Sequence, residues 1–105
     1  MPRREIDPTR RLARALIRSA EAAGCGISIA KEASRPWQSA TFTGAWHEFT
    51  FTAVGDKALE RWLEQLPSAD LRTPGHLVAD ITVSCARCAT GAATVLINAL
   101  TVLER

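Results

Sequence analysis

The spacing of apolar residues predicts two helices. From Asp7 to Gly24 the apolar residues recur every three to four positions, which is the period of one helical face. Asp7 followed by Pro8 suits the start of this helix, and Gly24 suits its end. A second helix is expected to begin at Asp56 and to end at Pro67. The two apolar stripes consist of Leu12, Leu16, Ala20 and Ala23 in the first helix, and of Leu59, Trp62, Leu63 and Leu66 in the second.

Four other segments have the residue types and the alternation of β-strands. Residues 27–35 alternate at their start, and Pro36 behind them suits an edge strand or a turn. Residues 39–53 are rich in Thr and Phe, which favour strands. Residues 78–85 alternate cleanly, which indicates a strand with one buried face. Residues 93–103 are apolar in both phases, which predicts a central strand buried on both faces.

The order of these elements, αββαββ, predicts an α+β fold in two layers. It resembles a circularly permuted ferredoxin-like arrangement, an αβ-plait with a four-stranded antiparallel sheet and two helices on one face. This arrangement would place the second and fourth strands, which are the longest and most apolar, in the centre of the sheet. We therefore expect residues 1–105 to form a single αβ-plait domain, with residues 1–6 as a flexible arm. A resemblance to so broad a fold class implies no function.

The strands carry more apolar side chains than two helices can cover. If Phe49, Phe51 and Ile81 face the helices, a second set of residues collects on the other face of the sheet. In water this set would be a large apolar patch for a monomer. Three outcomes are open: a dimer interface, a ligand pocket, or a bulge at residues 46–48 that shifts the register and removes the patch. The second set consists of Phe42, Trp46, Asp80, Thr82, Ser84, Leu96, Asn98, Leu100 and Val102, and in the third strand it alternates with an inward set of Ala79, Ile81, Val83 and Cys85.

Composition narrows the class of protein. The chain has 105 residues, of which 47% are hydrophobic and 23% charged, and its net charge is +2. This composition excludes a disordered chain, and the length suits one folded domain. The longest apolar run, residues 92–103, is too short and too interrupted to cross a membrane, so no membrane partner is expected. The N-terminus shows no secretory signal, which favours a cytoplasmic location.

Basic charge is concentrated at the start of the chain. The first 18 residues contain six arginines against Glu5 and Asp7, a local balance of +4. No aromatic residue is interleaved with these arginines, and no nucleic-acid recognition motif is present. We therefore expect a solvated helix face, and nucleic acid is not expected as a partner.

Cys85 and Cys88 form the only short motif, CxxC, which is a weak signal for zinc or for thiol chemistry. A structural zinc site needs four ligands, and Cys25, His47 and His76 stand at no familiar spacing from the pair. Residues three apart on a strand also point to opposite faces. The sequence therefore favours Cys85 as a small buried residue, and no metal and no cofactor is expected.

The other titratable residues of the strands favour structural roles. His47 and Glu48 are adjacent, so their side chains face opposite sides, and His47 is expected to be exposed or at an edge. His76 follows a turn, where its ring could bond turn carbonyls. Asp80 is expected to pair with a neighbouring polar side chain or with an arginine of a partner.

These observations favour a non-catalytic binding or assembly module that homodimerises through the helix-free face of the sheet. No catalytic residue is assigned, and an enzyme is the less favoured interpretation. The residues expected to form the interface or a ligand site are Phe42, Trp46, Asp80, Asn98 and Leu100.

Two alternatives stay open. In the first, a small apolar ligand occupies a cleft on the same face, with Asp80 as acid or base, Trp46 as a wall and Gly44 leaving space beside it. In the second, the protein is a zinc- or thiol-dependent regulator that acts through Cys85 and Cys88.

Overall fold

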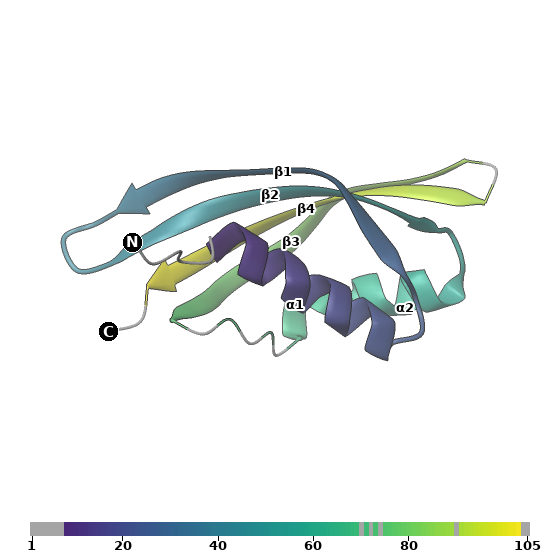
Figure 1. Cartoon of the computed structure of the whole chain (residues 1–105), viewed down its shortest axis with the longest axis horizontal. Helices are drawn as coiled ribbons and strands as arrows, with labels where there is room; N and C mark the ends of the chain where they lie inside the picture. Colours follow the sequence, from purple (N-terminus) through teal and green to yellow (C-terminus); the bar gives the residue numbers. More distant parts are fainter. Residues whose placement is uncertain (1–7, 70, 72, 74, 90, 104–105) are drawn as a thin grey trace, which may run out of the picture.

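The structure is a computed structural model that describes residues 8–69, 71, 73, 75–89 and 91–103, with the backbone alone at Cys85, Cys88 and Ala89. The arm expected over residues 1–6 and the cap expected at Asp7 lie outside this part. Helices and strands follow in the predicted order (Figure 1). The elements are α1 (Pro8–Ala22), β1 (Ile27–Gln38), β2 (Thr43–Val54), α2 (Lys57–Gln65), the 3-10 helix η1 (Leu66–Ser68), β3 (His76–Ala89) and β4 (Ala92–Leu103).

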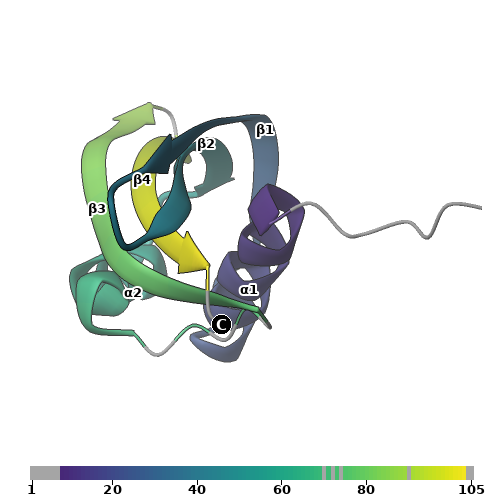
Figure 2. The same ribbon diagram turned by 90° about the vertical axis from the view of Figure 1, so that its left-hand side faces the viewer.

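The four strands form one antiparallel sheet in the order β1-β2-β4-β3. The second and fourth strands therefore occupy its centre, as predicted. Figures 1 and 2 show both helices on the same side of this sheet, so the protein is an α+β structure of two layers. Neither helix has the length and the apolar composition needed to span a bilayer.

β1 is longer than the sequence indicated, because it continues through Pro36 to Gln38. The strand tolerates this proline because it lies at the edge of the sheet, where one side of its backbone needs no partner. The turn to β2 is closed by Ser39, whose N–H donates to the Phe42 carbonyl over 2.8 Å. The Phe42 N–H in turn donates to the Ser39 hydroxyl oxygen over 3.1 Å.

The ladder between β2 and β4 is continuous, so the bulge that one alternative placed at residues 46–48 does not occur. The irregularities lie in the two edge strands instead. In β3 one of them makes Ala79 the extra residue, and Ala79 is exposed rather than facing the helices as expected. Val78 packs against the core in its place. The register shifts lie between Ile29 and Lys31 in β1, and between Val78 and Asp80 and between Val83 and Cys85 in β3.

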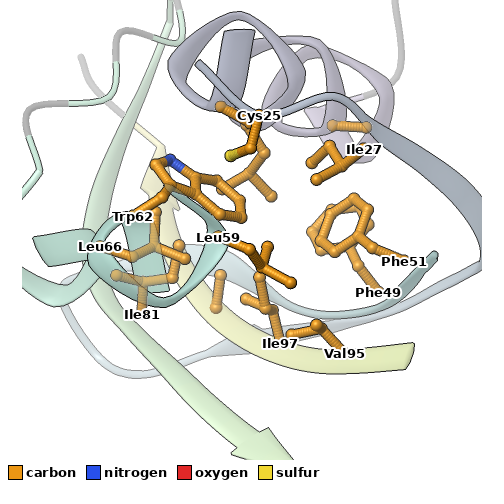
Figure 3. Close-up of a cluster of buried hydrophobic side chains, with 14 of the residues drawn as sticks. Cys25, Ile27, Phe49, Phe51, Leu59, Trp62, Leu66, Ile81, Val95 and Ile97 are labelled. Carbon is orange, nitrogen blue, oxygen red and sulfur yellow. The ribbon is translucent and has the colours of Figure 1, made fainter. Parts of the chain in front are cut away.

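The core lies between the helices and one face of the sheet (Figure 3). Its centre is the inward face of β2 and β4, where Phe49, Phe51 and Ile97 are at most 1% exposed. Phe49 and Phe51 stack with ring centroids 5.7 Å apart. The residues of this core cluster are Leu12, Ala13, Leu16, Ala20, Cys25, Ile27, Phe49, Phe51, Leu59, Trp62, Leu66, Ile81, Ala93, Val95, Ile97 and Ala99.

α2 begins and docks as its sequence predicts. The Asp56 side chain accepts a hydrogen bond of 3.0 Å from the Leu59 N–H, which caps the helix. Trp62 is 3% exposed, and its indole N–H donates to the Ser19 hydroxyl of α1 over 3.0 Å. One side chain thus fills the space under the sheet and links the two helices.

β4 departs from its prediction in one respect. Its inward residues are buried, but every second residue is exposed or half-buried, so only one face is covered. The strand is central within the sheet, yet none of the described segments of the chain covers its outer face. The apolar residues of that outer phase therefore remain on the surface.

Replacing Trp62 by alanine should lower the free energy of unfolding by about 3–5 kcal/mol, because it leaves a large cavity between α2 and the sheet. The control is Arg14→Ala on the exposed face of α1, which should change it by less than about 0.5 kcal/mol. Urea unfolding followed by circular dichroism measures both. Equal effects of the two substitutions would contradict the packing described for Trp62.

Candidate functional site

The helix-free face of the sheet is organised in rows that cross all four strands. Residues paired across the ladder share a face, and on β2 and β4 this face alternates with the buried His47, Phe49, Ala99 and Thr101. We name three rows after their β2 or β1 residue. In the order β1, β2, β4, β3 they are the Trp37 row (Trp37, Gly44, Val102, Leu77), the Trp46 row (Arg35, Trp46, Leu100, Asp80) and the Glu48 row (Ala33, Glu48, Asn98, Thr82).

The first two rows hold a contiguous apolar strip. Trp46 is 44% exposed and Leu77 is 58% exposed, whereas Trp37, Leu100 and Val102 are half-buried. Phe42 lies in the β1-β2 turn beside the Trp37 row and is also exposed. The structure therefore places Phe42, Trp46 and Leu100 outside the core. The apolar strip consists of Trp37, Trp46, Leu77, Leu100 and Val102.

Polar side chains border this strip. Asp80 is in the same row as Trp46 and Leu100, and Asn98 is in the next row beside Glu48. The structure thus brings the predicted residues Trp46, Asp80, Asn98 and Leu100 together on one face. Asp80 is exposed, and its carboxylate makes no ion pair or hydrogen bond with another described side chain.

A hollow of about 400 Å³ lies on this face over β1, β2 and β4. A smaller one of about 150 Å³ adjoins it and shares Ala33, Glu48 and Asn98. The larger hollow is lined by Ala33, Ser34, Arg35, Trp46, His47, Glu48 and Asn98. It has aromatic, cationic, carboxylate and amide groups on its wall, a mixture that can orient a small molecule.

Gly44 does not leave the space that the sequence suggested. A Cβ at Gly44 would meet the Thr101 carbonyl and would lie 2.9 Å from the Trp37 indole nitrogen. The Trp37 indole therefore lies over Gly44 and occupies the space that was expected to be open beside Trp46. The glycine is needed because the neighbouring strand and this indole approach its backbone closely.

Leu77 and Trp37 are the members of the apolar strip that the sequence pattern does not predict. The Trp37 indole nitrogen is buried and has no hydrogen-bond partner among the described residues. The predicted first strand stops at Arg35 and the predicted third strand starts at Val78, so Trp37 and Leu77 lie just outside the predicted strands. Arg35 and Trp37 share a face because they are two positions apart on β1. Extending the alternation of the first strand past Arg35 is the sequence signal that would have placed Trp37 on this face.

His47 is buried, and the expectation that it would be exposed or at an edge is wrong. It is 1% exposed, and its ring stacks on Phe49 with centroids 6.2 Å apart. Nδ1 lies 3.0 Å from the Thr9 hydroxyl and Nε2 lies 2.8 Å from the Thr101 hydroxyl. A neutral imidazole donates through one nitrogen and accepts through the other, and hydroxyls serve both roles. His47 is thus a bonded core residue that joins α1, β2 and β4.

The other candidates for chemistry do not converge on this face. The Thr73 hydroxyl donates to the His76 carbonyl over 2.9 Å, whereas the His76 ring nitrogen Nδ1 is buried with no partner in the described part of the chain. The side chains of Cys85 and Cys88 lie outside the description, so the zinc and thiol hypotheses stay predictions. Among the described side chains, no three His, Cys, Asp or Glu residues gather as metal ligands would.

Cys25 is a free cysteine in the core, between α1 and β1. Its burial raises the pKa of the thiol, and the negative charge of Asp56 raises this pKa further. The thiol is therefore protonated at neutral pH and is a poor nucleophile.

Comparisons of the chain with protein-family models, with curated proteins and with solved structures found no match. Its function is therefore inferred from the geometry of the helix-free face.

Thr101→Val should lower the free energy of unfolding by about 1–3 kcal/mol, because it removes the buried hydrogen bond between Nε2 of His47 and the Thr101 hydroxyl. Thr94→Val is the matched control, since Thr94 is exposed on the same strand and its substitution should have little effect. Chemical unfolding monitored by Trp fluorescence compares the two variants. If the control lost as much stability as Thr101→Val, the hydrogen bond would not be the cause.

The raised pKa of Cys25 predicts how stability depends on alkaline pH. An unfolded chain ionises this thiol at its ordinary pKa, whereas the folded chain resists ionisation. The contribution of Cys25 is therefore complete below that ordinary pKa and is lost as the pH rises towards the folded value. The difference in unfolding free energy between the wild type and Cys25→Ala should shrink as the pH rises above the ordinary pKa of a cysteine thiol, about 8.5. A difference that stayed constant would contradict the assignment.

Proposed function

We propose that this protein is a non-catalytic assembly module that forms a homodimer through its helix-free face. The observation that carries the proposal is the apolar strip, which crosses all four strands at the end of the sheet next to the β1-β2 turn and which no described segment of the chain covers. Contiguous apolar surface of this kind marks an interaction site in proteins that otherwise stay in solution. A second copy is the simplest cover, because a two-fold axis buries one patch against itself.

The size of the face suits this role. β1, β2 and β4 each have 12 residues. Four strands of this length measure about 19 by 40 Å, or about 750 Å². A standard stable interface buries about 800 Å² of each partner. The helix-free face is therefore large enough for a dimer, provided that most of it takes part.

The polar groups of the face support binding better than catalysis. Asp80 and Glu48 are both exposed and belong to different rows. Neither has a described nucleophile or base bonded to it, as a catalytic arrangement would require. Exposed carboxylates at the border of an apolar strip suit ion pairs and hydrogen bonds with a partner.

The permuted ferredoxin-like plait and the cytoplasmic location belong to the same proposal. The order β1-β2-β4-β3 is the one that such a permuted plait would have, and it supports this interpretation of the fold. With both helices on one side, the fold presents its other face to a partner.

The hollow beside Trp46 favours a second candidate, a small-molecule site. Its volume of about 400 Å³ is that of many ligand pockets, and Trp46 would form an apolar wall. Arg35, Glu48 and Asn98 would orient a polar group of the ligand. A chain that stays monomeric, and whose Trp fluorescence and melting temperature change with a small apolar compound, would support this candidate over the dimer.

In solution the chain should be a dimer of two 11.4 kDa subunits at about 100 µM, because the apolar strip is buried only in the pair. Leu100→Glu should make it monomeric, since it places a charge in the middle of the strip. Multi-angle light scattering measures the mass, and circular dichroism checks that the variant folds.

Gln65→Glu introduces the same charge on the exposed face of α2, far from the strip, and should remain dimeric. A wild-type chain that is monomeric at this concentration would overturn the proposal.

A further inference from the structure

The Trp46 row has opposite charges at its two ends. Arg35 is on β1 at one edge of the sheet and Asp80 is on β3 at the other edge, with Trp46 and Leu100 between them. Figure 2 shows these two strands on opposite sides of the central pair. Both charged side chains are exposed, and neither forms an ion pair with another described residue.

Two kinds of two-fold axis can place one such face on another. An axis that runs along the strands, between β2 and β4, exchanges the two edges, so β1 of one copy lies over β3 of the other. An axis that runs across the strands in the plane of the interface places each edge strand over the same strand of the other copy, so β1 lies over β1. The charges of the face distinguish the two.

An axis across the strands is unfavourable for the charges. On the helix-free face β1 carries Lys31 and Arg35, both exposed and both basic. Placing β1 over β1 would bring these like charges together on both sides of the axis, and such contacts oppose association.

An axis along the strands is favourable in each row. Arg35 of one copy would lie opposite Asp80 of the other, and symmetry would repeat this pair. In the Glu48 row, the Glu48 carboxylate would lie opposite Asn98, whose amide N–H can donate to it. The apolar residues would also meet, Trp46 opposite Leu100 and Trp37 opposite Leu77.

We propose that two copies dock face to face about a two-fold axis that runs along the strands between β2 and β4, with Arg35 of each copy paired to Asp80 of the other. This inference rests on the proposed function, because it specifies the geometry of the same interface. Sheets packed in this way lie about 10 Å apart with strand directions within about 30°. A long arginine and a short aspartate together span that gap. The pairs lie at the rim, so they set the orientation of the two copies.

Reversal of the two charges tests this geometry. Arg35→Asp alone and Asp80→Arg alone should each raise the dissociation constant of the dimer by about tenfold or more, because each creates two like-charge contacts. The double variant Arg35→Asp/Asp80→Arg should restore it to within about threefold of the wild type. Sedimentation equilibrium measures the dissociation constants, and circular dichroism confirms folding.

Two control variants make the test specific. Arg18→Asp reverses an exposed arginine on α1, outside the face, and should leave the dissociation constant within about twofold. Lys31→Asp should not tighten the dimer, whereas under an axis across the strands it would oppose Arg35 with a negative charge and tighten it.

The outcomes separate this inference from the proposed function. A monomeric wild type would overturn both. A dimeric wild type that Leu100→Glu dissociates, but whose single charge variants are not rescued by the double variant, would support the interface and overturn the axis. Rescue by the double variant would support both.

Discussion

The structure depends on the unequal covering of the two faces of its sheet. The pleat of a strand sends successive side chains to opposite faces, so burying Phe49 and Ile97 under the helices commits Glu48 and Asn98 to the other side. Two helices cover one face and stabilise the fold through it. The apolar residues in the outer phase gain nothing from this packing and stay at the surface of the described chain, where the proposed second copy would bury them. The fold and the proposed interface therefore share one cause.

Features governed by local pattern could be predicted from the sequence. The stripe of Leu59 and Trp62, the cap at Asp56 and the inward phase of Ile81 all follow from period and capping rules, and all are observed. The assignment of Trp46 and Leu100 to the uncovered face followed from alternation alone. These features needed no knowledge of which strands are neighbours.

Features set by pairing between strands could not be predicted in this way. The bulge at Ala79 turns Val78 to the core and Leu77 to the helix-free face, whereas unbroken alternation from Ile81 would place Ala79 inward and Val78 outward. The burial of His47 depends on hydroxyls of Thr9 and Thr101, which come from distant parts of the chain. A polar residue is accepted in a core when tertiary partners satisfy it, and such partners leave no local signal.

The two edge strands explain why copies would associate through the helix-free face and not by pairing edge to edge. An exposed edge strand is a template for pairing with another chain, unless it is protected. β1 carries Pro36, Lys31 and Arg35, and a bulge interrupts its ladder, while two further bulges interrupt β3 at the opposite edge. These features hinder continuous edge pairing on both sides and leave the apolar strip as the accessible attractive surface. Because the same edge charges point across the face as well, they can oppose edge pairing and select the orientation of a face-to-face dimer at once.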